Sequence, residues 1–366
     1  MITSETFIKK ITNTKRSKLA YFVLILSIFI HIIWITRAEL PSANFLGFDF
    51  KEKFLNYFDN YGPFGLFLIK AINSVYMIAI LSVFELTSSP SISINSIKNL
   101  SIFRTFASKG AKYADIYYWF FPQILKRDRF KFLVVTLTLG FSRIHENFGS
   151  TLNSLYDKLF PFSSIPIIVI FLFSLLLADF AEYFWHWFVH KYFWELHEHH
   201  HSATEMTIFS GGRDNMWTIL ITTIPLLPLT VLSTIVINKS LEQGSWLIFT
   251  IFCGIQLLSK LFSDVAHSSI KLIFPKPFSY IFMSPSLHWI HHSNNPKHFN
   301  KNLGKIFTFP DRIFGTYLDE SHLKDINGFG VGYSDYNEYG VLYCYYILPI
   351  KKLIKKYRNL FFKKSY

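Results

Sequence analysis

Eight of the fourteen histidines fall into three short groups in the second half of the chain, and this clustering strongly constrains the fold. The groups read HxxxH, HxxHH and HxxHH, and they contain His186 and His190; His197, His200 and His201; and His288, His291 and His292. Side chains three or four positions apart share one face of an α-helix, so each group can direct two or three imidazoles to one point. Imidazole binds iron, copper, zinc and nickel, and eight rings are too many for one ion. The spacing therefore predicts helices that carry two metal ions.

The composition indicates that these helices belong to a membrane protein. Of 366 residues, 51% are hydrophobic and only 17% are charged, and a membrane-crossing helix needs roughly 20 predominantly apolar residues. Five segments qualify, at residues 19–36, 64–84, 165–185, 216–237 and 246–262, and a weaker sixth lies at 132–148. Basic residues flank the first segment and no small-residue cleavage site follows it, so it is expected to be an anchor. We therefore expect an all-α, multi-pass membrane helical bundle with four to six crossings.

The distribution of basic residues predicts the orientation of this bundle. Residues 1–18 hold five Lys or Arg against one Glu, and residues 87–130 hold seven against two Asp, whereas the loops at 149–164 and 238–245 hold one Lys each. Because Lys and Arg favour the cytoplasmic side, the histidine groups, which follow predicted spans, are expected to form a histidine-rich metal-binding cap on the cytoplasmic face. The membrane would be a bacterial inner membrane or the endoplasmic reticulum.

The C-terminal residues mix basic and aromatic side chains. Seven Lys or Arg lie between residues 351 and 364, interleaved with Leu, Ile, Tyr and Phe, and they contribute much of the net charge of +13. Beside a membrane, such a segment most simply lies on anionic lipid headgroups; the alternative is a solvated charged tail. No nucleic-acid-binding motif accompanies the charge, so a nucleic-acid partner is not expected.

No motif for an organic redox cofactor is evident. The two cysteines, Cys253 and Cys344, form no metal-binding pair, disulfide framework or haem attachment motif. The glycines at Gly328, Gly330 and Gly332 follow no strand–helix unit, so they indicate a turn and not a dinucleotide site. If the metals do redox chemistry, their electrons must come from outside the chain.

Two acidic residues share the helical stripe of the first histidine group. Glu182 lies four residues before His186, and Asp179 lies seven before it. A metal-bound imidazole usually donates its second N–H to a carboxylate or a carbonyl, which fixes the tautomer and the ring direction. Asp179 and Glu182 are therefore expected to be partners of the metal ligands.

The step from the first to the second histidine group is about two helical turns. Because His190 and His197 are seven residues apart, one continuous helix could align His186, His190, His197 and His201. His199 falls off this stripe. It is expected either to face solvent or to contact a ligand without binding metal.

Several short motifs in the second half occur together. They are DFAEYFWH at residues 179–186, HEHHHS at 197–202, SPSLHWIHHS at 284–293, KNLG at 301–304 and DRIFGT at 311–316. Over roughly residues 165–317, this combination resembles the fatty acid hydroxylase/sterol desaturase superfamily, the histidine-box membrane di-iron oxygenases. The DRxFGT ending distinguishes it from the acyl-CoA desaturases, whose first histidine box is usually the wider HxxxxH.

The resemblance implies a ninth ligand and a reaction. The family uses a further histidine shortly after the last membrane hairpin, and His267 occupies that place. The implied cofactors are two Fe ions (Zn in isolated protein) with O₂ as co-substrate. The implied reaction is hydroxylation or desaturation of an unactivated C–H bond of a lipid, a sterol, fatty acyl chain or related molecule. The implied partner is an electron donor of the ferredoxin or cytochrome b5 type with its reductase.

The chain then divides into three regions. Residues 1–150 are a membrane region of unassigned role, residues 151–320 a fatty acid hydroxylase-like catalytic domain, and residues 321–366 a basic aromatic tail at the membrane surface. The alternative function is a non-catalytic membrane protein that binds or transports zinc or iron. A transporter places its ligands near the bilayer midplane, and structural zinc closes its coordination shell; here the histidines follow the predicted span ends, which favours the oxygenase. The lipid, and the choice between hydroxylation and desaturation, stay open.

Overall fold

The computed structural model describes residues 75, 78–87, 93–107, 115, 118, 146–160, 165–243, 247–332, 336 and 339–362. These residues are mostly helical and contain no β-strand, only the isolated antiparallel bridges Phe282–Phe307 and Ser293–Phe329. The α-helices are α4 (Ile94–Lys98), α5 (Ser101–Ala107), α8 (Glu146–Leu159), α9 (Ile167–Tyr192), α10 (Trp194–His201), α11 (Met216–Thr223), α12 (Leu227–Glu242), α13 (Leu247–Ala266), α14 (Phe278–Ile281), α15 (Leu287–His291), α16 (Phe309–Ile313) and α18 (Leu348–Phe362). The 3₁₀ turns are η1 (Ser210–Gly212), η2 (Ile224–Leu226), η3 (Pro296–His298) and η4 (Glu320–Asp325), and η5 (Tyr343–Ile347) is a π-helical turn.

One helix within the described residues is long and apolar enough to cross a membrane by itself, namely α9. A second crossing is available if the pair formed by α11 and α12, bent by 59°, counts as one span. The predicted span at 246–262 forms the 20-residue helix α13. The predicted segment at 19–36, and most of those at 64–84 and 132–148, lie outside the described residues. The helical class is therefore confirmed, whereas the multi-pass bundle remains a prediction.

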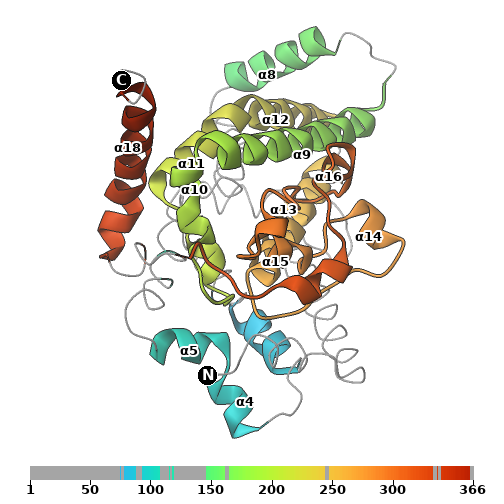
Figure 1. The fold of residues 1–366 in the computed structure, drawn as a ribbon. Helices are drawn as coiled ribbons and strands as arrows, with labels where there is room; N and C mark the ends of the chain where they lie inside the picture. Colours follow the sequence, from blue (N-terminus) through green and yellow to red (C-terminus); the bar gives the residue numbers. More distant parts are fainter. Residues whose placement is uncertain are drawn as a thin grey trace.

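A layer of three helices forms one side of the described domain (Figure 1). α9 packs against α12, and α12 packs against α8. The apolar cluster between them joins Ile170 and Phe171, near the start of α9, with Val236 and Ile237, near the end of α12, so the two helices run antiparallel. At the end of the layer farthest from the histidines, Asn238 Nδ2 donates a hydrogen bond to Asn153 Oδ1 (3.1 Å).

The chain turns between the first two histidine groups. α9 ends at Tyr192 and α10 begins at Trp194, with Phe193 between them at φ −124° and ψ 34°, outside the helical region. The expectation of one continuous helix is therefore wrong. The break lets α10 dock elsewhere: the Leu196 carbonyl accepts hydrogen bonds from the side chains of Asn215 and Thr218. Tertiary contacts, which helical spacing alone does not contain, decide the direction of α10.

The C-terminal helix α18 packs against α10, which carries the second histidine group (Figure 1). Lys352 Nζ lies 2.5 Å from Glu198 Oε1, and Lys356 Nζ lies 2.9 Å from Glu195 Oε2. On the other side of α18, Lys351, Lys355 and Ile354 are exposed. The tail is thus an amphipathic helix, and two of the basic residues expected on lipid headgroups instead form ion pairs with the protein.

Candidate metal centre

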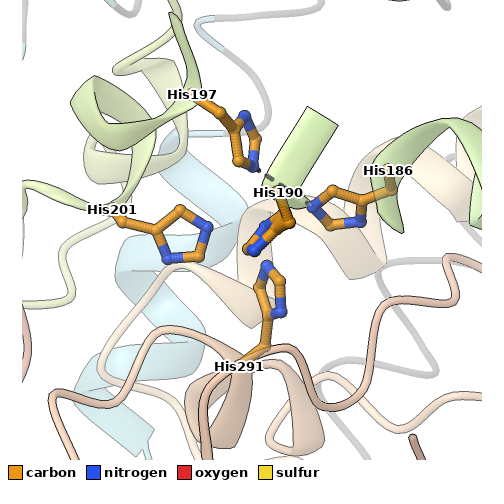
Figure 2. A group of neighbouring side chains, drawn as sticks. All are labelled: His186, His190, His197, His201 and His291. Carbon is orange, nitrogen blue, oxygen red and sulfur yellow. Dashed lines mark hydrogen bonds between the residues drawn. The ribbon is translucent and has the colours of Figure 1, made fainter. Parts of the chain in front are cut away.

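All nine histidines predicted as ligands lie together, in two adjacent groups. The five-histidine group comes from α9, α10 and α15, and its rings surround a common point in Figure 2; it consists of His186, His190, His197, His201 and His291. The four-histidine group consists of His200, His267, His288 and His292. Within each group, the candidate ligand nitrogens all lie within 4.8 Å of one another. Two groups are the arrangement that two metal ions need.

Residues adjacent in the sequence belong to different groups. His200 and His201 are neighbours on α10, yet one lies in the four-histidine group and the other in the five-histidine group. His291 and His292 divide in the same way. Successive side chains on a helix point about 100° apart, so each HH pair reaches two separate points. This explains why two of the three motifs end in a double histidine.

Backbone carbonyls fix the direction of three rings. Nδ1 lies 2.8 Å from the Leu303 oxygen in His186, 2.9 Å from the Lys301 oxygen in His291, and 2.7 Å from the Ser263 oxygen in His267. A carbonyl oxygen can only accept, so Nδ1 carries the proton in each ring. That leaves the Nε2 lone pair free to bind a metal, as expected for ligands held by an outer hydrogen bond.

The inner nitrogens fit bound transition-metal ions. Nε2 of His190, His201 and His291 is buried without a hydrogen-bond partner, an arrangement that is costly unless a ligand satisfies it. In the other group, Nε2 of His288 lies 3.1 Å from Nε2 of His267 and 3.0 Å from Nε2 of His292. Nitrogens about 3 Å apart match ligands that share one ion at roughly 2.0–2.1 Å each.

Burial also sets the protonation state of the ligands outside α9. Desolvation lowers the pKa of His201, His291 and His292 well below its usual value, and neighbouring imidazoles lower it further. Neutral imidazole is the form that binds metal. The lowered pKa of these three rings thus favours the form that binds a cation.

The two acidic residues expected beside the ligands both contact the loop that follows Leu303. Asp179 accepts hydrogen bonds from the backbone N–H groups of Ile306 and Phe307, at 3.1 and 3.2 Å. Glu182 Oε2 lies 3.5 Å from Lys305 Nζ. Both therefore hold the segment that follows Leu303, the residue whose carbonyl receives His186. Helical spacing placed the carboxylates correctly on the stripe, but it could not show that a distant loop lies across it.

A carboxylate that the sequence argument missed lies beside His200. Asp214 Oδ1 is 3.5 Å from His200 Nδ1. Asp214 follows η1, thirteen residues beyond the second histidine box, and no spacing rule connects the two positions. It occupies the kind of position that we had expected for Asp179 and Glu182.

The DRxFGT motif holds the loop that carries two of the carbonyl acceptors. Asp311 is completely buried, and its carboxylate accepts hydrogen bonds from the N–H groups of Leu303 (2.8 Å) and Gly304 (2.7 Å) and from Thr316 Oγ1 (2.7 Å). Gly304 is required because a Cβ there would lie 2.7 Å from both Asp311 Oδ2 and the Phe307 oxygen. The motif therefore acts through the backbone of KNLG, which positions His186.

His199 lies in neither group. It is fully buried, with its ring 4.5 Å from that of Tyr118, edge to face, and stacked 4.7 Å from that of Tyr336. The expectation that it faces solvent is wrong, because the α18 side of the protein covers this face of α10. His199 is a core residue on the side of α10 away from its ligands.

A cavity of about 360 Å³ reaches the two groups. Its lining includes His186 and His197 of one group and His200, His267 and His288 of the other. Its apolar lining includes Ile255, Leu258, Phe262 and Ala266 of α13, and Thr218 and Thr222 of α11 also line it. The cavity can therefore hold an apolar chain next to the histidines.

Comparison with known proteins agrees with this geometry. Residues 171–316 match the fatty acid hydroxylase family. Alkylglycerol monooxygenase of Caenorhabditis elegans is 29% identical over 153 residues, which covers 41% of this chain and 27% of that protein. The chain thus spans only about a quarter of this curated relative. No solved structure matches. Residues 171–316 therefore form a fatty acid hydroxylase domain, and this domain contains all nine histidines.

Proposed function

We propose that this protein is a membrane-bound di-iron oxygenase that hydroxylates or desaturates an unactivated C–H bond of a lipid, using O₂ and external electrons. The observation that carries the proposal is that histidines of both groups line one largely apolar cavity. Nine imidazoles, with no cysteine among the described residues of either group, make a site suited to iron, although zinc fits the same ligands.

The protein's own residues bind, orient and exclude water. Two iron ions held by the two groups would supply O₂ activation and C–H oxidation, the chemistry that the cofactor brings. The carbonyls of Leu303, Lys301 and Ser263 keep three Nε2 lone pairs directed inward. Leu258, Phe262 and the other apolar residues of the wall would hold the substrate chain and keep water from the reacting carbon.

The cavity supports a substrate with an apolar chain. Its wall is mainly aliphatic and aromatic. The hydroxyl groups of Thr218 and Thr222 donate to the Leu196 and Thr218 carbonyls, so their oxygens offer only acceptors to a polar group of the substrate. The relative named for alkylglycerol makes an ether-linked glycerolipid the first substrate to test. Sterols and fatty acyl chains are the other candidates.

We further propose that the centre lies at the cytoplasmic end of a multi-pass membrane domain and receives electrons from a ferredoxin- or cytochrome b5-type donor and its reductase. Ile167 and His186 lie on one helix, 19 residues and roughly 28 Å apart, close to the hydrocarbon thickness of about 30 Å. The histidines would therefore sit about one bilayer thickness from the start of α9. Basic residues at the N-terminus favour the cytoplasmic side for the histidine end.

Lipid mass spectrometry of a deletion strain and its complemented counterpart tests the proposal. Loss of a product about 16 mass units heavier, or 2 lighter, than its precursor would identify hydroxylation or desaturation. The comparison should include a strain complemented with His288→Ala. The alternative, a protein that only binds or transports zinc or iron, predicts unchanged lipids, purified protein that holds zinc in a closed shell, and no absorbance change with dithionite and O₂.

A further inference from the structure

A third group of metal-binding side chains lies outside the nine-histidine centre. It consists of His298 of η3 and His322 and Asp325 of η4, and we call it the outer cluster. The candidate ligand atoms of its three members all lie within 4.8 Å of one another. No local spacing pattern predicts it, because His298 and His322 are 24 positions apart in the sequence.

His298 is the member that an ordinary ion pair does not explain. His322 Nδ1 lies 3.4 Å from Asp325 Oδ2, and both side chains are 41% exposed, so these two alone would be a normal surface pair. His298, in contrast, has 0% exposure, and both of its ring nitrogens are buried without a hydrogen-bond partner. Buried polar side-chain atoms are rarely left unpaired, and each exception needs a physical explanation.

Hydrogen bonds between side chains and the backbone hold the two turns that carry the outer cluster. Asn295 Nδ2 donates a hydrogen bond to the backbone carbonyl oxygen of Asp325 at 2.8 Å, which joins η3 to η4. Asn295 Oδ1 also caps η3 by accepting from Lys297 N at 3.1 Å, and Asp319 Oδ1 caps η4 by accepting from Ser321 N at 3.0 Å. The two turns that carry the ligands are therefore fixed in place by their own hydrogen bonds.

We propose that the outer cluster binds a divalent transition-metal ion, of which zinc is the best match. Two imidazoles and one carboxylate are a typical zinc ligand set, and water can complete a four-coordinate shell from the exposed side of His322 and Asp325. Coordination would satisfy one nitrogen of His298. The proposal does not depend on the reaction at the nine-histidine centre.

An ion at the outer cluster would stabilise the loop that follows the third histidine box. Lys301 N donates to the His298 oxygen at 3.2 Å, and the Lys301 oxygen receives Nδ1 of His291 at 2.9 Å. The ion would thus fix η3. Two hydrogen bonds, both through Lys301, connect η3 to His291 of the five-histidine group. The role of the ion is structural: it positions a loop and takes no part in the reaction.

Counting zinc on the iron-loaded full-length protein tests the proposal. After incubation with zinc sulfate and gel filtration, iron and zinc are measured together by mass spectrometry. The wild-type protein should retain one zinc ion per chain more than His322→Ala or Asp325→Asn, at equal iron content. Glu320→Gln is the matched control, since it removes the same charge from the same turn without touching the cluster.

Thermal unfolding gives a second readout. Zinc should raise the Tm of the wild-type protein and of Glu320→Gln, and should leave the Tm of His322→Ala unchanged, because an ion that binds only the folded state stabilises it. His322 and Asp325 are half-exposed, so their variants should fold. Equal zinc content in wild type, His322→Ala and Asp325→Asn would overturn the proposal, as would an equal loss of zinc in Glu320→Gln.

Discussion

The imidazole rings of His201 and His292 stack with their centroids 4.3 Å apart and their planes 24° apart, although the two residues belong to different groups. They join the five-histidine and four-histidine groups into one continuous cluster. The sequence neighbour of each ring belongs to the other group: His200 lies in the four-histidine group and His291 in the five-histidine group. The relative position of the two proposed metal ions is therefore fixed by α10 and α15 together.

Removal of a ligand should have different effects on the metal content of the two groups. His200→Ala leaves three histidines in its group, so we expect about one of the two ions to be lost. His190→Ala leaves four, and should keep more of its metal. Both variants should lose turnover. Metal-to-protein ratios of the purified variants make the comparison, and equal losses would show that the groups do not bind separate ions.

His199→Ala is the control within the same box. We expect it to keep its metal and most of its activity, and to lose roughly 2–3 kcal/mol of stability, as for other large-to-small changes in a core, because the ring packs between Tyr118 and Tyr336. Denaturant unfolding measures the stability loss. Loss of iron in this variant at the temperature of the assay would contradict the register of the second box.

Gly211→Ala should disturb the four-histidine group from outside it. A Cβ at Gly211 would lie 2.9 Å from Cγ of His267, so the ring must move away. We expect weaker metal binding and lower turnover, measured by competition with a chelator. Gly254→Ala is the matched control, since a Cβ there meets nothing within 4 Å. That change in α13 should stabilise the helix by up to about 1 kcal/mol.

Asp311→Asn should loosen the loop that positions His186. The amide can accept with one oxygen only, so a buried N–H of Leu303 or Gly304 loses its partner, at a cost of roughly 1–3 kcal/mol. We expect a lower Tm and a lower turnover number at unchanged KM for the lipid. Thr316→Val tests the third hydrogen bond of the same carboxylate. It should have a smaller effect, and wild-type behaviour of Asp311→Asn would rule out this role for the motif.

Lys352→Met should weaken the contact between the C-terminal helix and the second histidine box. Glu198 has a side chain only 4% exposed, and removal of its cation leaves a buried carboxylate, which costs up to about 3 kcal/mol. The Tyr336 hydroxyl would still donate to it at 2.9 Å. Thermal unfolding should show the loss, whereas Lys355→Met, on the exposed side of α18, should unfold like the wild type.

The proposed orientation can be tested with single cysteines in a background lacking Cys253 and Cys344. Gln243 at the end of α12 and Lys297 near the histidines are both exposed. An impermeant thiol reagent should label a cysteine at position 243 in intact cells, and one at position 297 only after the membrane is opened. The opposite pattern would place the centre on the outer side and exclude a cytoplasmic electron donor.

The sequence was most informative where spacing alone determines geometry. The three boxes are local patterns, so the ligand positions followed from helical periodicity, and His267 from the family resemblance. Periodicity failed where distant segments meet. It could not show the break at Phe193, after which Asn215 and Thr218 bind the Leu196 carbonyl, nor the burial of His199 beside Tyr336, which lies more than a hundred positions away. Nor could it bring together His298, His322 and Asp325.

The three carbonyl acceptors of the ligand rings also affect how the centre can evolve. A point mutation replaces a side chain, yet the groups that orient His186, His267 and His291 belong to the main chain and survive any exchange at Leu303, Ser263 or Lys301. The tautomer of these three rings therefore depends on the path of the main chain and not on the side chains at the three acceptor positions. For the proposed oxygenase, a substitution in the cavity wall would therefore change the fit of the lipid while the main chain keeps these three rings in the same tautomer.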